Sequence, residues 1–389
     1  MVSKRGKQKL TLCLDEQEIK SGILWKPDAY SITFAHDKVY TFLRDGRLFS
    51  AFIAGDFFQR GLNNQILHKG RDAQSKVRFR KILSPEQALG ISQKIHAEIQ
   101  VLLNQARTLL EPEPTEILTD ILNWTPDKLA KDGVRFQEIY APISILPPDQ
   151  YLSIVLQVTL GCSYNRCNFC NFYKNRPFKI KDLEQFDQHL HAVHDFLGAS
   201  NPMRKGIFLA DGDALMTPQK RLIAAIKNVR SVYPDLPLYA FMDAFRPGVK
   251  SVQDWQSLQN LGLKRVYFGI ESADQELLRF LNKPGKPSET LLEVQNLKKA
   301  GISLGLIFMI GAGGKEYAKQ HLQASMKWLT KLELDRDDMI FLSEFIPHPD
   351  QPYVKDFQAA GLNELGTAER QAEAQKWLAQ VKSLKTRVV

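Results

Sequence analysis

Three of the four cysteines of the chain lie within nine residues of one another, directly after an apolar run. They are Cys162, Cys167 and Cys170, and the run before them spans residues 151–160. Thiolates bind zinc and iron–sulfur clusters. The cysteines are spaced too tightly for ordinary disulfides, which favours a reducing compartment and metal ligation. The group predicts a metal site with three protein ligands and one coordination position open to another molecule.

Zinc and iron–sulfur are the two candidates for this site. A structural zinc ion needs four ligands, so Cys13 or a histidine would have to complete it, and the sequence has no second C-x2-C and no H-x3-H. His189, His191 and His194 lie on a predicted amphipathic helix, and we expect them at the surface. An iron–sulfur cube tolerates one iron without a protein ligand. The spacing therefore favours iron–sulfur over zinc.

Elements that would position the cysteines alternate between strand and helix from residue 151 onwards. Apolar runs predict strands at 151–160, 206–210, 236–242, 264–270, 302–310 and 338–343. Segments with helical periodicity lie between them at 181–197, 217–232, 251–261, 274–300 with a break at 283–285, and 316–332. Such alternation predicts a parallel sheet that is buried on both faces. A doubly wound sheet and a partial barrel both fit.

Polar and glycine residues recur where these strands end. The second strand is followed by Asp211-Gly212-Asp213, the third ends at Asp243, the fourth at Glu271-Ser272, the fifth at Gly311 and the sixth at Glu344. Active sites of parallel α/β folds lie at the carboxyl ends of the strands. We therefore expect an active-site rim at this end of the sheet.

The N-terminal part is predicted to be β-rich, with one long helix. Short β-type runs lie at 30–35, 39–43 and 48–54, and Asp45-Gly46 is a hairpin signal. A helix is predicted to begin at Ser84-Pro85 and to end before residue 111. Residues 115–150 are weakly patterned and are expected to be a connection. A basic stretch is expected to be a solvated or an anion-binding loop, and it contains Lys69, Arg71, Lys76, Arg78, Arg80 and Lys81.

The net charge of +9 fits either an anionic partner or solubility alone. The N-terminal residues lack the apolar core of a secretory signal. The longest apolar stretch, near 302–312, is too short and too rich in glycine to cross a bilayer. We expect a cytoplasmic protein without a membrane span.

The cysteine segment resembles the cluster-binding loop of the radical S-adenosylmethionine (SAM) superfamily. In that family three cysteines hold a [4Fe–4S] cluster, and SAM chelates the fourth iron. Phe169 matches the aromatic residue that the family usually places before the last cysteine, near the adenine. The spacing C-x4-C-x2-C has one residue more than the common C-x3-C-x2-C. We expect the loop to accommodate the extra residue in its turn.

Further segments support the resemblance. Ala210-Asp211-Gly212-Asp213 occupies the place of the family's Gly-Gly-Glu motif, which receives the ammonium of the cofactor. Glu271 and Ser272 match the strand-four motif that binds the ribose or the methionyl group, and Ile310-Gly311 matches the strand-five element that flanks the adenine. By this resemblance these residues bind SAM, and the three cysteines bind the cluster.

The resemblance implies a partial (β/α)6 barrel of the TIM type over 150–345. It would follow a small N-terminal β-meander and helix domain at 1–149 and precede a mostly helical extension at 346–389. It also implies reductive cleavage of SAM to a 5′-deoxyadenosyl radical, oxygen sensitivity, and a one-electron donor of the flavodoxin or ferredoxin type.

The substrate is not indicated by the sequence. Tyr267, Asp243 and Glu344 are the candidates for substrate contact, because they lie on the inner face or at the carboxyl ends of predicted strands. No cobalamin motif and no second cysteine cluster is present. A small molecule or RNA remains possible as substrate. Two alternatives stay open: a non-catalytic chaperone that delivers haem or an iron–sulfur cluster, and a zinc-stabilised nucleic-acid-binding module.

Overall fold

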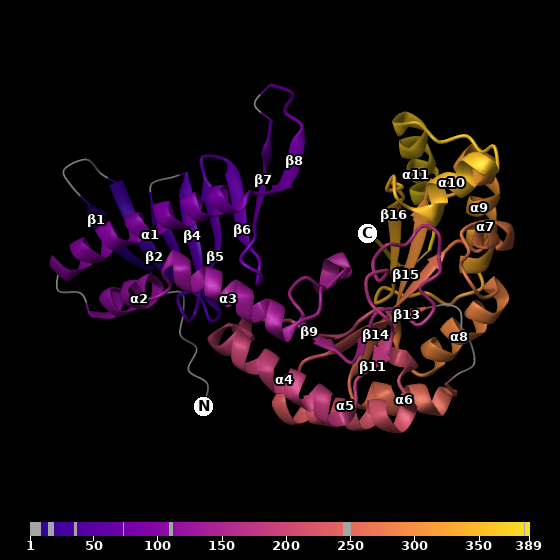
Figure 1. Cartoon of the computed structure of the whole chain (residues 1–389), viewed down its shortest axis with the longest axis horizontal. Helices are drawn as coiled ribbons and strands as arrows, with labels where there is room; N and C mark the ends of the chain where they lie inside the picture. The colour runs from indigo at the N-terminus through magenta and orange to yellow at the C-terminus, as the bar shows by residue number, and fades with distance from the viewer. Residues whose placement is uncertain are drawn as a thin grey trace. The chain divides into compact units, whose positions relative to one another are not determined.

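The structure is a computed structural model that describes residues 9–14, 19–34, 37–72, 74–108, 112–243, 250–384 and 386–389, with side chains from residue 22 onwards. The chain forms two compact units. The first comprises Met1–Pro142 with Ala192–Arg204, and the second comprises Ile143–His191 with Lys205–Val389 (Figure 1). This division falls before the expected boundary at 149/150, and residues 346–389 belong to the second unit.

The first unit contains an eight-stranded antiparallel sheet in which each strand pairs with its neighbour in sequence. Its strands are β1 (Lys9–Leu14), β2 (Ile19–Trp25), β3 (Ala29–Phe34), β4 (Lys38–Leu43), β5 (Leu48–Ile53), β6 (Asp56–Arg60), β7 (Ile66–Arg71) and β8 (Arg78–Ile82). The predicted N-terminal meander is confirmed in β3 to β5. The prediction of a basic loop is wrong, because this stretch forms the β7–β8 hairpin, whose charged side chains leave little apolar signal.

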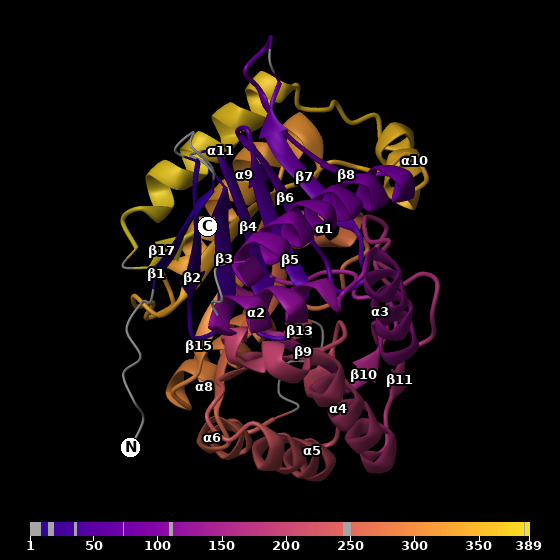
Figure 2. The same ribbon diagram turned by 90° about the vertical axis from the view of Figure 1, so that its left-hand side faces the viewer.

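Three helices pack on one face of this sheet, namely α1 (Pro85–Thr108), α2 (Pro112–Leu122) and α3 (Pro126–Ile139), with α1 lying across the strands (Figure 2). The predicted start of α1 is confirmed: the Gln87 amide donates to Ser84 Oγ, and the Ser84 amide donates to the Gln87 side chain. The expectation that 115–150 forms a connection is wrong. Thr125 caps α3 and Pro126 opens it, which repeats the pattern of Ser84-Pro85.

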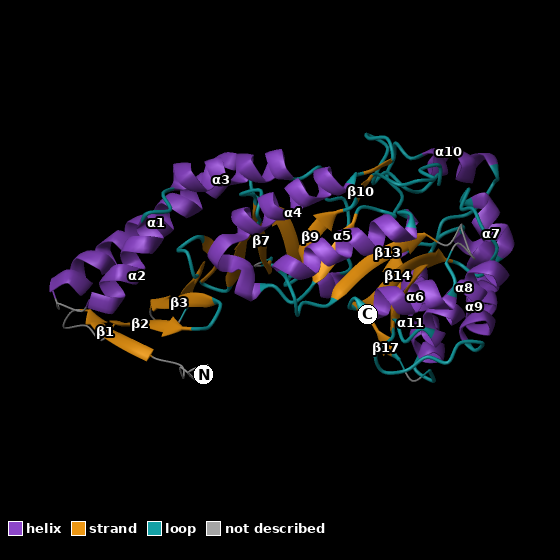
Figure 3. Cartoon of the chain, turned by 90° about the horizontal axis from the view of Figure 1, so that it is seen from below, coloured by secondary structure: helices purple, strands orange, loops and turns teal. Residues whose placement is uncertain are grey.

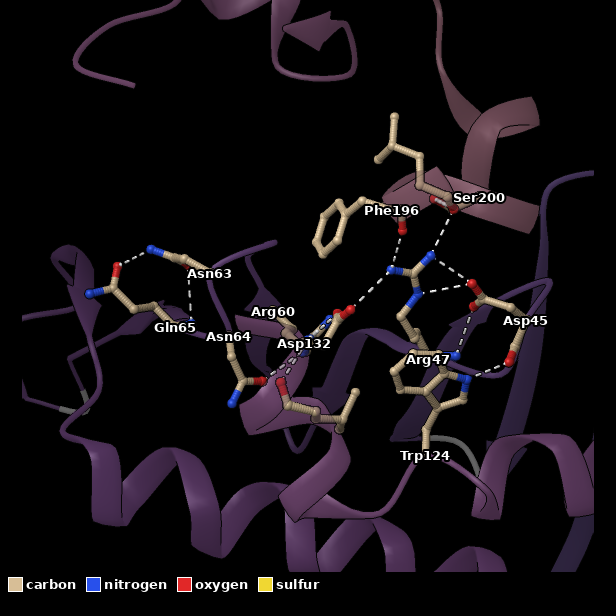
Figure 4. A network of polar contacts seen from close by, with 12 residues as sticks. Asp45, Arg47, Arg60, Asn63, Asn64, Gln65, Trp124, Asp132, Phe196 and Ser200 are labelled. Atoms are coloured by element: carbon tan, nitrogen blue, oxygen red, sulfur yellow. Dashed lines mark hydrogen bonds and ion pairs between the residues drawn. The ribbon is translucent and has the colours of Figure 1, made fainter. Parts of the chain in front are cut away.

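A buried ion network joins separate segments of the first unit (Figure 4). Arg60 donates to Asp132 at 2.9 Å, and Arg47 pairs with Asp45 at 2.6 Å and reaches Asp132 at 3.5 Å. The Arg47 guanidinium also donates to the backbone carbonyls of Phe196 and Leu197. Because Phe196 and Leu197 lie in the segment 192–204, Arg47 fastens that segment to the first unit.

The second unit contains a seven-stranded sheet in the order β17-β16-β15-β14-β13-β12-β9, and all of its pairs are parallel. The strands are β9 (Ile154–Gln157), β12 (Ile207–Ala210), β13 (Leu238–Asp243), β14 (Leu263–Glu271), β15 (Ser303–Ile310), β16 (Met339–Glu344) and β17 (Arg387–Val388). Six of them lie within, or one residue beyond, the six predicted strands. The terminal strands β9 and β17 do not pair with each other among the described residues, so the barrel is partial.

Helices follow the strands and line the outer side of the curved sheet (Figure 3). They are α4 (Leu183–Leu197), α5 (Gln219–Val232), α6 (Val252–Asn260), α7 (Gln275–Phe280), α8 (Pro287–Lys299), α9 (Gly314–Leu329) and α11 (Thr367–Val381). Helix α10 (Pro352–Ala359) instead packs on α7 and on the cysteine segment, where the Tyr353 amide donates to the Asn168 carbonyl. The predicted break at 283–285 separates α7 from α8. None of the helices in the described ranges is long and apolar enough to cross a membrane.

Candidate active site

The cysteine loop begins at the carboxyl end of β9 and is closed at its base. Strand β10 (Thr159–Leu160) pairs antiparallel with β11 (Lys179–Ile180), so the loop leaves and returns at one point. The loop starts at Gly161, where φ is +75° and an added Cβ would lie 3.1 Å from the Pro177 carbonyl oxygen. Only glycine meets both demands without strain.

The extra residue between Cys162 and Cys167 lies in a turn centred on Asn165. Its backbone adopts a φ of +49°, a left-handed conformation that asparagine tolerates better than most residues. The Asn165 side chain donates to the Tyr173 carbonyl at 2.8 Å, and Lys174 Nζ donates to the Asn165 carbonyl at 2.7 Å. The longer loop is therefore held by its own hydrogen bonds.

The turn after β12 supports this loop with two carboxylates. Asp211 accepts from the Gly161 amide and from the Arg176 guanidinium, both at 3.1 Å, so it joins the start of the loop to its end. Asp213 is fully buried and accepts from Ser163 Oγ at 2.5 Å. Both carboxylates, predicted to receive the cofactor's ammonium, are directed at the loop.

The three thiols lie at the inner side of the loop, and each is free of disulfide bonding. Burial raises the pKa of Cys162, of Cys170 and, to about 12, of Cys167. Hydrogen bonds from the backbone amides of Tyr164 and Asn165 favour the Cys162 thiolate, although burial outweighs them. Such buried sulfurs ionise readily only when a metal cation replaces the proton.

The arrangement fits a cluster better than a single ion. Among the described residues, no three His, Cys, Asp or Glu side chains converge closely enough to hold one metal ion. Cysteines that bind separate irons of a cube need not converge on one point, and backbone amides near the sulfurs are typical of cluster sites. The side chain of Cys13, the alternative fourth zinc ligand, lies outside the described residues.

Lys283 is the central cation of the site, and the sequence did not single it out. Its ammonium lies 3.0 Å from Asp243 at the end of β13 and 3.4 Å from Glu271 at the end of β14. Burial alone would lower the pKa of Lys283, but Asp243 and Glu271 raise it well above its usual value. Burial raises the pKa of Glu271, and Lys283 opposes this effect. Lys283 is therefore charged and joins two strand ends.

The end of α7 explains why Lys283 points inward. The Asn282 amide donates to the Arg279 carbonyl and the Lys283 amide donates to the Leu278 carbonyl, which together form a Schellman motif. Asn282 has a φ of +49° at the position that requires a left-handed conformation. Its side chain also donates to the Arg166 carbonyl, so the end of α7 is attached to the cysteine loop.

Several predicted residues support neighbouring strands instead of facing the cysteines. Ser272 Oγ lies 2.7 Å from His321 Nδ1, and His321 Nε2 lies 3.0 Å from the Met309 carbonyl. Burial lowers the pKa of His321 to about 4, so the ring is neutral at physiological pH, donates from Nε2 and accepts from Ser272. Ala210 and Ile310 are buried in their strands, and an added Cβ at Gly311 would lie 3.3 Å from the Arg370 side chain.

Tyr267 lies inside the barrel, as its inward position predicts, but its hydroxyl is used for support. It is fully buried, and its ring contacts those of Phe208, Phe241 and Phe341. The hydroxyl donates to Asp149 at 2.5 Å. This places the polar atom in a buried network with Gln150 and Arg265.

The prediction that His189 lies at the surface is wrong. Its side chain is buried, and its Nε2 accepts from the Gln157 amide at 3.0 Å. The physical reason is helical spacing: His189 is three residues after Phe186 and four before Val193, both of which belong to the buried stripe of α4.

A cavity of about 450 Å³ lies at the carboxyl ends of the strands and brings most of these groups together. Of the predicted site residues, it is lined by Cys162, Cys167, Cys170, Phe169, Gly212, Asp243, Glu271 and Glu344, and Lys283 lines it as well. Glu344 also pairs with Arg370 at 2.8 Å. The other predicted residues lie outside its lining, namely Ala210, Asp211, Asp213, Tyr267, Ser272, Ile310 and Gly311.

The sequence model of the Radical SAM superfamily matches residues 156–329, which contain the cysteine loop and most of the strands that enclose this cavity. The chain belongs to the radical SAM superfamily. Membership confirms the predicted family and fold and implies a [4Fe–4S] cluster and SAM as cofactors. Radical SAM enzymes need an electron donor.

Among curated proteins, the chain is 25% identical over 198 residues to the uncharacterized methyltransferase PH0819 of Pyrococcus horikoshii, covering 49% of this chain and 40% of the relative. It is 22% identical over 178 residues to the heme chaperone HemW of Bacillus subtilis, covering 44% and 45%. The chain thus spans less than half of the length of either relative.

Solved radical SAM structures resemble the chain at low identity. Coproporphyrinogen III oxidase (HemN) from Escherichia coli aligns with a TM-score of 0.47 and 13% identity, covering 64% of this chain and 55% of that one. Methylornithine synthase (PylB) aligns with a TM-score of 0.43 and 16% identity, covering 74% of both chains.

Proposed function

We propose that this protein is an enzyme that binds a [4Fe–4S] cluster through Cys162, Cys167 and Cys170 and cleaves SAM reductively in the cavity beside it. The observation that carries the proposal is that the three thiols and the Asp243–Lys283–Glu271 group line the same cavity. A cluster held by these three cysteines would supply the one electron needed for reductive cleavage of the C5′–S bond of SAM to methionine and a 5′-deoxyadenosyl radical, which would abstract hydrogen from a substrate.

The charged groups of the cavity suit a cationic ligand. Lys283 neutralises one of the two carboxylates that flank it, so Asp243, Glu271 and Lys283 together leave one negative charge in a mostly buried setting. A sulfonium or ammonium group gains from such a charge, because the low dielectric strengthens the attraction. This supports a SAM-binding role for Glu271, and Asp243 is its partner on the next strand.

The apolar part of the lining supports radical chemistry by excluding water. Phe241, Met242, Ile307 and Met309 come from the strands, and Phe169 covers the cavity from the cysteine loop. Gln351 donates to the Phe169 carbonyl at 2.6 Å, which fixes the backbone beside the last cysteine. We propose that Phe169 and Gly212 contact the cofactor, whereas Asp211 and Asp213 act indirectly by holding the loop.

Anaerobic reconstitution followed by reduction tests the proposal. We expect about four irons per chain and release of 5′-deoxyadenosine from SAM, with both lost in Cys167→Ala. Liquid chromatography of the reaction products measures 5′-deoxyadenosine and also separates S-adenosylhomocysteine, which is the product of polar methyl transfer. Equal amounts of 5′-deoxyadenosine from the wild type and the variant would contradict the proposal. A protein that holds the cluster and SAM but releases no 5′-deoxyadenosine would instead fit the cofactor-chaperone hypothesis.

The substrate class is open within this proposal, and a small molecule or RNA fits a cavity that opens at the strand ends. The protein would be incubated with deuterated candidate substrates. Deuterium in the 5′-deoxyadenosine, detected by mass spectrometry, would identify the molecule that donates hydrogen. We expect a flavodoxin or a ferredoxin as the one-electron donor. Replacing dithionite with either protein in the same assay checks that expectation.

A further inference from the structure

Helices α1 to α3 pack on one face of the sheet of the first unit. On the opposite face Met203 of the segment 192–204 buries Ala29 and Leu43 of β3 and β4, whereas basic side chains of β7 and β8 are exposed. Residues alternate across a strand, and the side chains that pack on α1 are Tyr40, Ala51 and Phe58. Their neighbours in each strand point to the opposite face. Following the pairing from β5 to β8, that opposite face carries Phe52, Phe57, Lys69, Arg71, Arg78 and Arg80, which we call the basic face.

Basic side chains stand opposite one another on this face. Lys69 pairs across the ladder with Arg80, and Arg71 pairs with Arg78. Like charges at directly opposite positions destabilise a sheet, so the arrangement costs stability unless an anion lies over it. Arg71, Arg78 and Arg80 are exposed, and none of them forms an ion pair with a residue in the described ranges.

The hairpin has little acidic charge of its own to offset this. Its one carboxylate, Asp72, accepts from the amides of Gln74 and Ser75 and from Ser75 Oγ, which keeps it in the turn. Lys76 in the same turn is exposed and has a φ of +57°. The hairpin is thus a strongly basic projection of the first unit.

Aromatic rings lie next to the lysine and arginine side chains of the basic face. Phe52 and Phe57 are directly paired on β5 and β6, and Phe52 is 38% exposed. Lys69 Nζ lies 5.5 Å from the centroid of the Phe57 ring and also donates to Gln59. Exposed rings on a sheet are platforms on which unpaired bases stack.

Protection of an edge strand explains only part of this pattern. Strand β8 is the last strand of the sheet, and lysines on an edge discourage pairing with another chain. That purpose requires charge on β8 alone, yet β7 carries matching charges. Basic residues two apart on a strand are separated by about 7 Å, which gives a repeating grid that suits a polyanion. Flat aromatic rings beside it suit bases rather than lipid headgroups.

We infer that the basic face binds single-stranded nucleic acid, with Lys69, Arg71, Arg78 and Arg80 contacting phosphates and Phe52 stacking on a base. This inference concerns the first unit and does not depend on the chemistry proposed for the cysteine loop.

Fluorescence anisotropy with the intact reconstituted protein tests it. The probes are labelled oligouridylate and oligodeoxythymidylate of about 12 nucleotides, at salt concentrations from about 50 to 200 mM. We expect the logarithm of the binding constant to fall linearly with the logarithm of the salt concentration. The slope should be about −2 to −3, as three to four phosphate contacts would give. Arg78→Gln with Arg80→Gln should reduce that slope by about 1.4. Phe52→Ala should weaken binding about tenfold without changing the slope.

The matched control replaces Lys94 and Arg107 with glutamine, because both are exposed on α1 and the change in net charge is the same. We expect it to leave the salt slope unchanged.

Equal weakening by the control, an unchanged slope in the hairpin variant, or no effect of Phe52→Ala would each overturn the inference. So would equally tight binding to duplex of the same length or to phosphatidylserine vesicles. Stronger binding of the RNA or of the DNA probe identifies the type of strand. Circular dichroism spectra and thermal unfolding curves that match those of the wild type show that the variants fold.

Discussion

Lys283 holds two buried carboxylates on neighbouring strands, and the cost of removing it can be predicted. Lys283→Met would leave Asp243 and Glu271 without their cation, so we expect the free energy of unfolding to fall by about 3 to 5 kcal/mol. Glu271→Gln should cost less, because Lys283 retains Asp243. Denaturant titration under anaerobic, reducing conditions measures both. The double variant Lys283→Met with Glu271→Gln should recover part of the loss, and no recovery would contradict the pairing.

Asn165 gives a second prediction, because it is the centre of the turn that accommodates the extra residue of the cysteine loop. Asn165→Gly keeps the left-handed backbone accessible, whereas Asn165→Ala places an ordinary side chain at a φ of +49° and costs about 1 kcal/mol. We expect the alanine variant to lose iron faster to a chelator after reconstitution, with the glycine variant closer to the wild type. Iron content over time, followed by absorbance, is the measurement. Equal loss from both variants would assign the effect to the lost hydrogen bond with Tyr173.

Sequence identified the cysteines because they lie close together along the chain, but it could not find Lys283. That residue reaches the cavity only because Asn282 ends α7 with a left-handed turn, and no local pattern shows where the turn points. Nor does the sequence show that Asp211 is held by Arg176, since this ion pair joins two separate loops. Strand-end positions predict which residues gather, and packing decides which of them face the cavity.

Helix α11 contains a buried acid that makes stability depend on pH. Burial raises the pKa of Glu373 to about 7 from the usual 4.5. The folded protein therefore holds this proton more tightly than the unfolded chain, and stability falls as the pH rises from about 4.5 to 7.

Glu373→Gln mimics the protonated form, so we expect it to stabilise the protein above pH 7 by about 1 to 3 kcal/mol and to change little at pH 5. Thermal unfolding at the two pH values measures the difference. Glu364→Gln is the control, because Glu364 is exposed near the start of the same helix. A stabilisation that is the same at both pH values would argue against a raised pKa at Glu373.

Elements with a regular apolar period were predictable, and those defined by charge or by short caps were not. Residues 303–310 alternate with helices and form β15 as expected. Helix α3 was missed although Thr125-Pro126 marks its start, because its apolar positions are few and Gly133 interrupts them. That glycine is needed for packing: an added Cβ would lie 2.7 Å from Asn64 Cβ. Strands β7 and β8 were missed because their side chains are basic.

At the scale of the whole chain, the first unit includes a segment from the middle of the second. Residues 192–204 complete α4 and the turn after it, and the Arg47 guanidinium binds the carbonyls of Phe196 and Leu197 at 3.0 and 2.7 Å. Both side chains that neutralise Arg47, Asp45 and Asp132, belong to the first unit. Arg47 therefore supplies a buried polar attachment for the segment, beside the packing of Met203 on Ala29 and Leu43.

Arg47→Met should loosen the attachment of this segment to the first unit. The methionine cannot donate to the two carbonyls, and Asp132 keeps only Arg60, so we expect the first unit to lose about 3 kcal/mol or more. Hydrogen exchange should rise in 192–204 and in α3, whereas the amides of β14 and β15 keep their protection. Arg135→Met is the control, because Arg135 is exposed and lies 5.8 Å from the Phe196 ring without binding the carbonyls. A uniform rise in exchange over both units would show that they unfold together and that Arg47 stabilises the whole chain.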